Sequence, residues 1–251
     1  MTRIFAIANE KGGVAKTTTA LSLGGAWAEA GKKVLLIDLD PQASLTLSIG
    51  FSPLDLSHSV TDLLINSISP NSLKKSTSIS GLDILPANSD LILAERYLAI
   101  RDNYKQLLRS AIRNITTYDA IIIDCPPSLG AITENALTSA DFLIIPVVPE
   151  YLAVCALRDT TQAVRMIRSK ENAHLSYRIL FTMVDRRIKT HKMICSKFRE
   201  KFGKAIFDTE IQVDTRLREA SFQGLPITHY VAETRGAKQY RNLAEELDDY
   251  I

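Results

Sequence analysis

Short apolar runs alternate with longer segments of helical period along almost the whole chain. The runs are continuously apolar, as expected of parallel strands that are covered on both faces. Six runs are predicted to be strands, at residues 3–8, 33–38, 82–86, 119–126, 142–149 and 178–184. Helical periodicity marks the segments 16–30, 90–116, 130–140, 152–170, 190–203 and 236–250.

This alternation predicts an α/β fold, a doubly wound and mostly parallel sheet with helices on both faces. Ligands of such a sheet bind at the carboxyl ends of its strands. The serine-rich segment 50–80, with Pro53 and Pro70, is expected to form surface helices and loops. A length of 251 residues suits one such domain. We expect a single domain over 1–251, with no helix-turn-helix extension before it.

Composition narrows the class of protein further. No apolar run approaches the roughly 20 residues that a membrane span needs, and the N-terminus lacks a signal peptide's cleavage region. The three cysteines, Cys125, Cys155 and Cys195, are widely spaced and form no C-x-x-C pair. They favour reduced thiols in a cytoplasmic protein over a disulfide or zinc framework.

The stretch NEKGGVAKTTT, residues 9–19, follows the first predicted strand and opens the first predicted helix. That is the context of a phosphate-binding P-loop. Two glycines allow backbone N–H groups to turn inward, and the helix N-terminus adds partial positive charge. Glu10 and Ala15 stand where the usual motif has its outer glycines, and we expect Ala15 to be tolerated at a negative φ. The predicted nucleotide contacts are Lys11, Gly12, Gly13, Val14, Ala15, Lys16, Thr17 and Thr18.

Three aspartates follow or end predicted strands close to this loop. Asp38 and Asp40, in IDLDPQ, are two residues apart and are expected to point to the same face. Asp124 ends the apolar run AIIID. A carboxylate at a strand end can also cap the next helix, and for Asp38 this alternative stays open. Lys16 is expected along the β- and γ-phosphates, and the Thr17 hydroxyl on Mg²⁺.

The stretches ANEKGGVAKTTTALSLGGAWAEAGKKVLLIDLDPQ and YDAIIIDCPPSLG resemble the ParA/MinD family of deviant Walker P-loop ATPases, most closely the small Soj-like ParA proteins. The resemblance covers essentially the whole chain. It implies that ATP and Mg²⁺ are cofactors and that Lys11 reaches across an ATP-bridged homodimer to the other nucleotide. It implies catalytic roles for Lys11, Lys16 and Asp40, and a metal site of Thr17, Asp40 and Asp124.

The adenine pocket departs from this family, whose Soj-like members place a proline and an asparagine against the base. The corresponding positions here are Gln212 and Asp214. Asp214 can still accept a hydrogen bond from the adenine amino group, so ATP remains the expected nucleotide. Met183 is expected to pack on the base, with a core position as the alternative.

Positive charge is concentrated in one part of the chain. The net charge is +2, but residues 158–204 carry 13 Lys/Arg against 4 Asp/Glu. This block predicts a surface that contacts phosphates of double-stranded DNA without reading bases; a solvated face and an anionic membrane surface are alternatives. The resemblance points to Arg187, and to Arg216 or Arg218 in place of an arginine that is Val213 here. The candidate DNA-binding residues are Arg186, Arg187, Lys189, Lys192, Lys197, Arg199, Arg216 and Arg218.

The resemblance implies a nucleoid-associated partition ATPase of the cytoplasm. Its ATP dimer would bind DNA non-specifically, and a ParB-like partner would stimulate hydrolysis and release. Three alternatives stay open: an ATPase that positions a carboxysome or chemoreceptor cluster, a MinD-like membrane regulator, and a metabolic or metal-handling enzyme. Stable membrane association is not expected, because the tip of the last predicted helix carries Glu245, Glu246, Asp248 and Asp249.

Overall fold

The computed structural model describes the backbone of residues 2–150 and 153–250. Its side chains are described outside 151–156. The strands are β1 (Arg3–Ile7), β2 (Val34–Asp38), β3 (Lys75–Ser76), β4 (Leu82–Leu85), β5 (Ala120–Asp124), β6 (Phe142–Val147), β7 (Ser176–Val184) and β8 (Ile206–Gln212). The longer helices are α1 (Lys16–Glu29), α3 (Val60–Asn66), α5 (Leu91–Leu98), α7 (Ala131–Ser139), α8 (Ala153–Lys170), α9 (Lys189–Phe202), α10 (Arg216–Phe222) and α12 (Arg235–Glu246).

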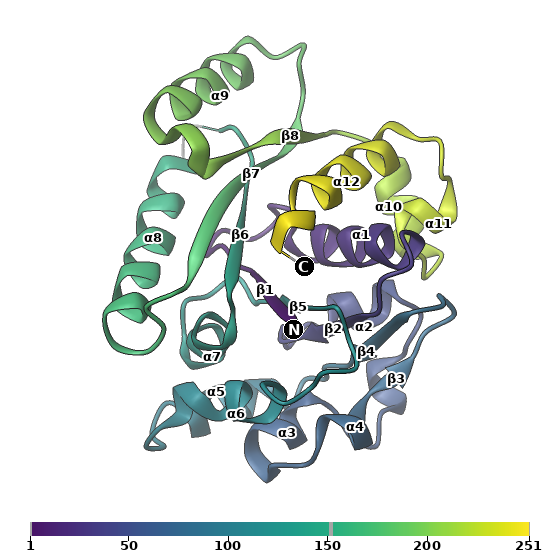
Figure 1. The fold of residues 1–251 in the computed structure, drawn as a ribbon, viewed down its shortest axis with the longest axis vertical. Helices are drawn as coiled ribbons and strands as arrows, with labels where there is room; N and C mark the ends of the chain where they lie inside the picture. Colours follow the sequence, from purple (N-terminus) through teal and green to yellow (C-terminus); the bar gives the residue numbers. More distant parts are fainter. Residues whose placement is uncertain (1, 151–152, 251) are drawn as a thin grey trace.

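The strands form one twisted sheet in the order β3-β4-β2-β5-β1-β6-β7-β8 (Figure 1). Every pairing is parallel except β3 with β4. The chain moves from β1 towards β2 on one side and later returns to add β6 on the other. The carboxyl end of β1 therefore lies where the strand order reverses, the expected ligand position of a doubly wound sheet.

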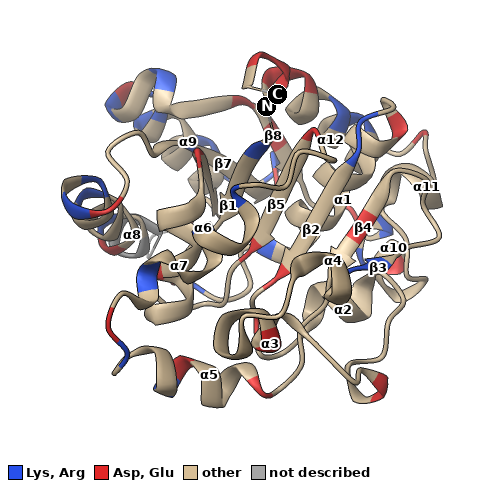
Figure 2. Ribbon diagram, turned by 60° about the horizontal axis from the view of Figure 1, so that its bottom comes forward, with Lys and Arg blue, Asp and Glu red and all other residues tan. Residues whose placement is uncertain are grey.

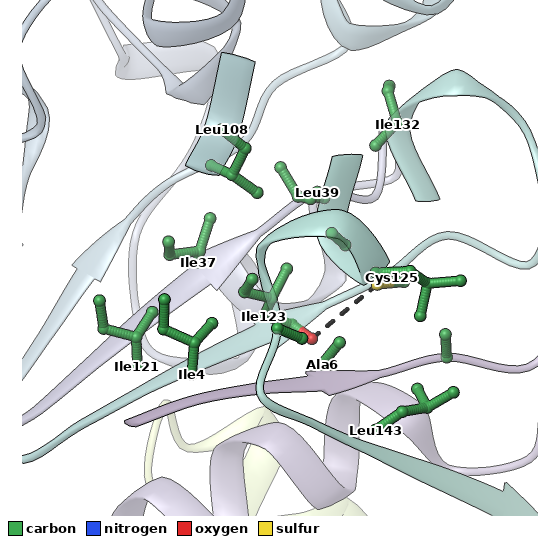
Figure 3. Close-up of a cluster of buried hydrophobic side chains, with 14 of the residues drawn as sticks. Ile4, Ala6, Ile37, Leu39, Leu108, Ile121, Ile123, Cys125, Ile132 and Leu143 are labelled. Atoms are coloured by element: carbon green, nitrogen blue, oxygen red, sulfur yellow. Dashed lines mark hydrogen bonds between the residues drawn. The ribbon is translucent and has the colours of Figure 1, made fainter. Parts of the chain in front are cut away.

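Two apolar cores cover the two faces of the sheet. Along β1, Ile4 and Ala6 face one core while Phe5 and Ile7 face the other, because successive strand side chains alternate. The first core packs under α5, α7 and α8 and also holds Cys125, shown among its neighbours in Figure 3. The second packs under α1 and α12 (Figure 1). Both cores confirm the predicted doubly wound α/β fold.

The structure corrects the prediction in two places. The segment 90–116 is two helices, α5 and α6 (Leu107–Ile112), because the polar stretch at 101–103 turns the chain and Asn103 takes φ 57°. The edge strand β8 was not predicted, since its sequence IFDTEIQ exposes polar residues on one side. Helices α10 and α11 (Ile227–Tyr230) follow it and were also missed. The segment 50–80 does contain short helices, among them α3 and α4 (Pro70–Leu73).

Candidate nucleotide-binding site

The loop between β1 and α1 has the backbone of a tight phosphate loop. Gly13 has φ 70°, and Ala15, the residue before α1, has φ 67°. The expectation of a negative φ at Ala15 is therefore wrong. A Cβ at positive φ is strained by about 1–2 kcal/mol relative to right-handed backbone. The loop keeps this conformation because its neighbours hold it on both sides.

Buried polar contacts hold the loop in place. Asn9 accepts from the Lys11 N–H through Oδ1 at 3.0 Å and donates through Nδ2 to the Pro146 carbonyl at 2.7 Å. Thr182, in β7, donates to the Val14 carbonyl at 3.0 Å. Neither residue was predicted, although Asn9 lies directly after the first strand. Together they tie the loop to β6 and β7.

Lys16 turns back into the loop that precedes it. Its buried ammonium donates to the carbonyls of Asn9 and Lys11, at 3.1 and 3.2 Å. Burial lowers the pKa of Lys16, an effect that the charge of Asp124 opposes. These two hydrogen bonds hold the Lys16 ammonium at the mouth of its own loop, and its contact with the β- and γ-phosphates stays a prediction.

Asp124 and Thr17 form a site that suits Mg²⁺. The Thr17 hydroxyl donates to Asp124 Oδ2 at 2.7 Å. Asp124 is fully buried, and its Oδ1 has no hydrogen-bond partner among the described residues. Burial, and then the neighbouring Asp38, raise the pKa of this carboxyl. A hydroxyl and an unpartnered carboxylate oxygen are the hard oxygen donors that Mg²⁺ prefers, so these residues fit the metal.

Asp38 and Asp40 have different surroundings. Asp38 is fully buried beside Asp124 in the sheet register, and it accepts from the N–H groups of Asp40 and Thr46 and from the Thr46 hydroxyl. Burial raises the pKa of Asp38. These bonds favour the structural alternative for Asp38, because they anchor the turn and α2 (Ser44–Ser48). Asp40 is only partly buried and accepts from the Gln42 N–H at 2.9 Å.

Lys11 does not point into the loop with Lys16. Its ammonium pairs with Glu150 Oε2 at 2.6 Å, beyond the end of β6. The two side chains are 28% and 54% exposed. Glu150 was not predicted, because it is 139 residues away in sequence.

A second carboxylate lies at the start of α7. Glu95, in α5, accepts from the N–H groups of Ala131 and Ile132, at 2.7 and 2.9 Å. Those N–H groups have no partner within the helix, and the helix dipole favours an anion there. A Cβ on Gly130 would lie 1.9 Å from Glu95 Oε1, so glycine is required for this contact. Glu95 therefore connects α5 to the start of α7, directly after the CPPSLG segment that follows Asp124.

The predicted adenine residues lie together at the ends of β7 and β8. Gln212 is paired with Val184, next to Met183, which takes φ 49°. The Asp214 carboxylate already accepts from the N–H groups of Arg216 and Gly236, both at 3.0 Å. Asp214 thus joins the starts of α10 and α12, a structural role that the sequence did not indicate.

Half of the eight predicted DNA-binding residues form ion pairs within the chain. Arg187 pairs with Asp185 at 2.7 Å, and Arg216 with Glu219 at 2.7 Å. Arg199 contacts Glu210 at 3.0 Å and the Phe207 carbonyl at 3.1 Å, and Arg186 reaches the same glutamate at 3.5 Å. The other four candidates are exposed and have no carboxylate partner among the described residues: Lys189, Lys192, Lys197 and Arg218.

The doubly wound sheet and the loop at its reversal point define a P-loop nucleotide-binding protein. The family model described as an AAA domain matches residues 2–177. The sporulation initiation inhibitor protein Soj of Bacillus subtilis is 38% identical over 98% of both chains. The chromosome partitioning protein ParA of Myxococcus xanthus is 36% identical over 98% of this chain and 87% of that protein. The chain belongs to the ParA/MinD family of ATPases.

A solved structure has a closely similar fold. Cobyrinic acid a,c-diamide synthase from Mycobacterium smegmatis, solved with an ATP analogue and magnesium, has a TM-score of 0.88 and 34% identity. The similarity covers 98% of this chain and 94% of that one. No helix within the described residues is both long and apolar enough to cross a membrane.

Proposed function

We propose that this ParA-type ATPase, whose cofactors are ATP and Mg²⁺, is a DNA partition switch of the cytoplasm. ATP binding closes a homodimer across the loop face, and the dimer binds DNA of the nucleoid without sequence preference. A ParB-like partner then stimulates hydrolysis, and the protein is released. In this mechanism Lys16 holds the β- and γ-phosphates, Asp124 and Thr17 hold Mg²⁺, and Asp40 positions water.

The position of Lys11 is the observation that carries this proposal. Lys16 already occupies the mouth of its own loop, whereas the Lys11 ammonium is partly exposed and held by one exposed carboxylate. A second cation in that place can serve the nucleotide of another protomer, as an arginine finger does in trans. Such fingers contribute about 10³–10⁵ to the rate where they have been measured.

Ion pairs within the chain reduce the number of cations that we propose for the DNA surface. An ion pair must break before its cation can neutralise a phosphate, so the unpaired Lys189, Lys192 and Arg218 are the first candidates. Lys197 is also unpaired but lines a groove between α8 and α9. Each phosphate that is neutralised contributes about −0.9 to the slope of log affinity against log salt. Replacing Lys189 and Lys192 by alanine should therefore make that slope shallower by about 1.8 per protomer.

The deciding experiment is binding of a random-sequence duplex with ATP, with ADP and without nucleotide, at two salt concentrations. The switch predicts binding that depends on ATP, weakens with salt and ignores sequence. Lys16→Ala should lose nucleotide binding, while Asp40→Ala should bind ATP and DNA without turnover. Equal binding in all three nucleotide states, or normal turnover by Asp40→Ala, would reject the proposal.

A carboxysome or chemoreceptor positioning ATPase would give the same result, because the partner protein determines the cargo. A MinD-like regulator would instead bind anionic liposomes with ATP. A metal-handling enzyme needs accessible cysteine ligands. Cys125 and Cys195 are buried, and the side chain of Cys155 lies outside the described residues.

A further inference from the structure

Helices α8 and α9 lie beside each other on one side of the molecule and enclose an open groove of about 880 Å³ (Figure 1). The groove runs along α9 from Thr190 to Phe202 and is lined from α8 by Leu157, Arg158, Thr161 and Arg165. None of the nucleotide contacts predicted above lines it. At one end it reaches Glu150, the residue that holds Lys11.

The floor of the groove is apolar. Leu157 and Phe198 are buried, Ile194 and Phe202 are partly buried, and Met193 is 50% exposed. A half-exposed methionine above aromatic and aliphatic side chains leaves apolar surface that another apolar group can cover. Flexible methionine is common on surfaces that accommodate a partner.

Both rims of the groove are positively charged. Arg158 and Arg165 project from α8, and Lys197 and Lys201 from α9; Figure 2 shows this charge on both helices. Of these four, Arg158 pairs with the partly exposed Asp159 at 3.2 Å, and the other three have no carboxylate partner among the described residues. Glu150 is the one acidic lining residue among those described, and it is paired with Lys11.

The groove cations are separate from the proposed DNA surface. At 100° per residue, Lys189 and Lys192 lie about 140° and 160° around the helix axis from Ile194 on the groove floor. Lys189 and Lys192 therefore face away from the groove, and neither lines it. The phosphates of a duplex would also gain nothing from a floor of leucine, methionine and phenylalanine.

We propose that this groove binds an acidic amphipathic helix of a partner protein. Thr190 to Phe202 spans about 18 Å, enough for three turns of a docked helix. Such a helix would place apolar residues at i, i+3, i+4 and i+7 on the floor, and its flanking glutamates or aspartates would meet cations on both rims. Recognition by charge on two sides selects acidic over basic helices. This inference goes beyond the proposed DNA switch and does not depend on it.

The chain carries natural probes for a test without nucleotide or DNA. Met193 lines the groove, whereas Met166, which is equally exposed at 50%, and Met183, in β7, do not. The probe is a stapled helical peptide of about 14 residues, four turns, with leucine on one face and glutamate on the others. Its addition should shift the Met193 methyl NMR signal saturably and leave Met166 and Met183 unchanged.

Two comparisons identify the cause of binding. A twin peptide with lysine in place of glutamate should not bind, and Lys201→Glu should weaken the acidic peptide roughly five- to tenfold. Lys204→Glu, an exposed cation of the same region outside the groove, should leave affinity within about twofold. Equal binding of both peptides, or no saturable shift at Met193, would overturn the proposal.

Two other occupants would be visible in the same spectra. A Met193 shift that depends on protein concentration alone would show a second copy in the groove. A Met193 shift with duplex DNA, or displacement of the peptide by DNA, would assign the groove to the nucleic-acid surface. Either result would overturn the proposal that an acidic helix occupies the groove.

Discussion

The ammonium of Lys11 is held 2.6 Å from Glu150 within the same protomer. The proposed action of Lys11 on another protomer's nucleotide requires that this ion pair break. Partly exposed pairs of this kind are worth about 0.2–1 kcal/mol. The pair would therefore oppose the proposed dimer closure by only about this amount.

Glu150→Gln should release Lys11 and tighten the ATP-dependent dimer. The affinity of the dimer should rise by up to about fivefold for each Lys11 that is released, which corresponds to about 1 kcal/mol. Sedimentation equilibrium with a non-hydrolysable ATP analogue measures it. Glu10→Gln is the matched control, because Glu10 is an exposed carboxylate of the same loop without an ion pair among the described residues. A weaker dimer would mean that Glu150 itself contributes to the interface.

The left-handed Ala15 gives a second prediction. Ala15→Gly should raise the free energy of unfolding by about 0.5–1 kcal/mol, because glycine adopts a positive φ without a clash. Urea denaturation of the nucleotide-free protein measures the change. Ala28→Gly, inside α1, should instead lower the free energy of unfolding by about 0.5–1 kcal/mol. A loss of stability at both positions would show that the loop accommodates alanine without strain.

Local pattern was enough to predict the central strands, the loop and the three aspartates. Continuous apolar runs end at the same edge of a parallel sheet, so the residues that follow them meet there. Strand β8 escaped this reasoning because one side of an edge strand is exposed and polar.

The remaining features depend on contacts between distant residues. Glu150 contacts Lys11, and Glu95 contacts α7, only after the chain has folded. Arg199 carries charge in the sequence but is held by Glu210 and the Phe207 carbonyl in the structure. A count of positive charges cannot separate such a structural arginine from a free lysine such as Lys192.

A pH-dependent contribution to stability comes from the pair between α1 and α12. Arg241 donates to both oxygens of Glu29, at 2.7 and 2.9 Å. This hydrogen bonding lowers the pKa of Glu29 below its ordinary 4.5. The depressed pKa means that the stabilisation is complete above the unfolded-state pKa and is lost as pH falls through the folded-state value.

Glu29→Gln should therefore cost about 0.5–1 kcal/mol at pH 7 and progressively less below about pH 4.5. Chemical denaturation at several pH values measures the difference from the unsubstituted protein. Glu233→Gln is the control, because its pair with Lys238 has an 85% exposed carboxylate and should contribute almost nothing. A cost for Glu29→Gln that persists undiminished at pH 3 would assign it to lost packing instead of charge.

The buried carboxylate of Asp124 predicts opposite effects on stability and on metal binding. In the nucleotide-free protein its Oδ1 is unpartnered among the described residues, and Asp38 lies beside it in the sheet. Asp124→Asn removes one of two neighbouring buried acids. We expect the nucleotide-free variant to gain about 1–3 kcal/mol, because the amide removes a buried negative charge that Asp38 destabilises.

The same variant should lose the stabilisation that Mg²⁺ adds to bound ATP. Ligand at 100 times its dissociation constant stabilises a protein by about 2.7 kcal/mol, and a neutral amide is a poor replacement for a carboxylate near Mg²⁺. Thermal unfolding with EDTA and with Mg²⁺–ATP gives both quantities, and Asp55→Asn, an exposed surface control, should change neither.

If Mg²⁺–ATP stabilised Asp124→Asn as much as it stabilises the unsubstituted protein, Asp124 would be excluded from the metal site. A variant less stable in EDTA would show that the hydrogen bond from Thr17 to the native carboxylate outweighs the cost of burying its charge. The combination of higher intrinsic stability and lost metal response is expected if folding buries this charge with Oδ1 unpartnered among the described residues, where the ion can bind it.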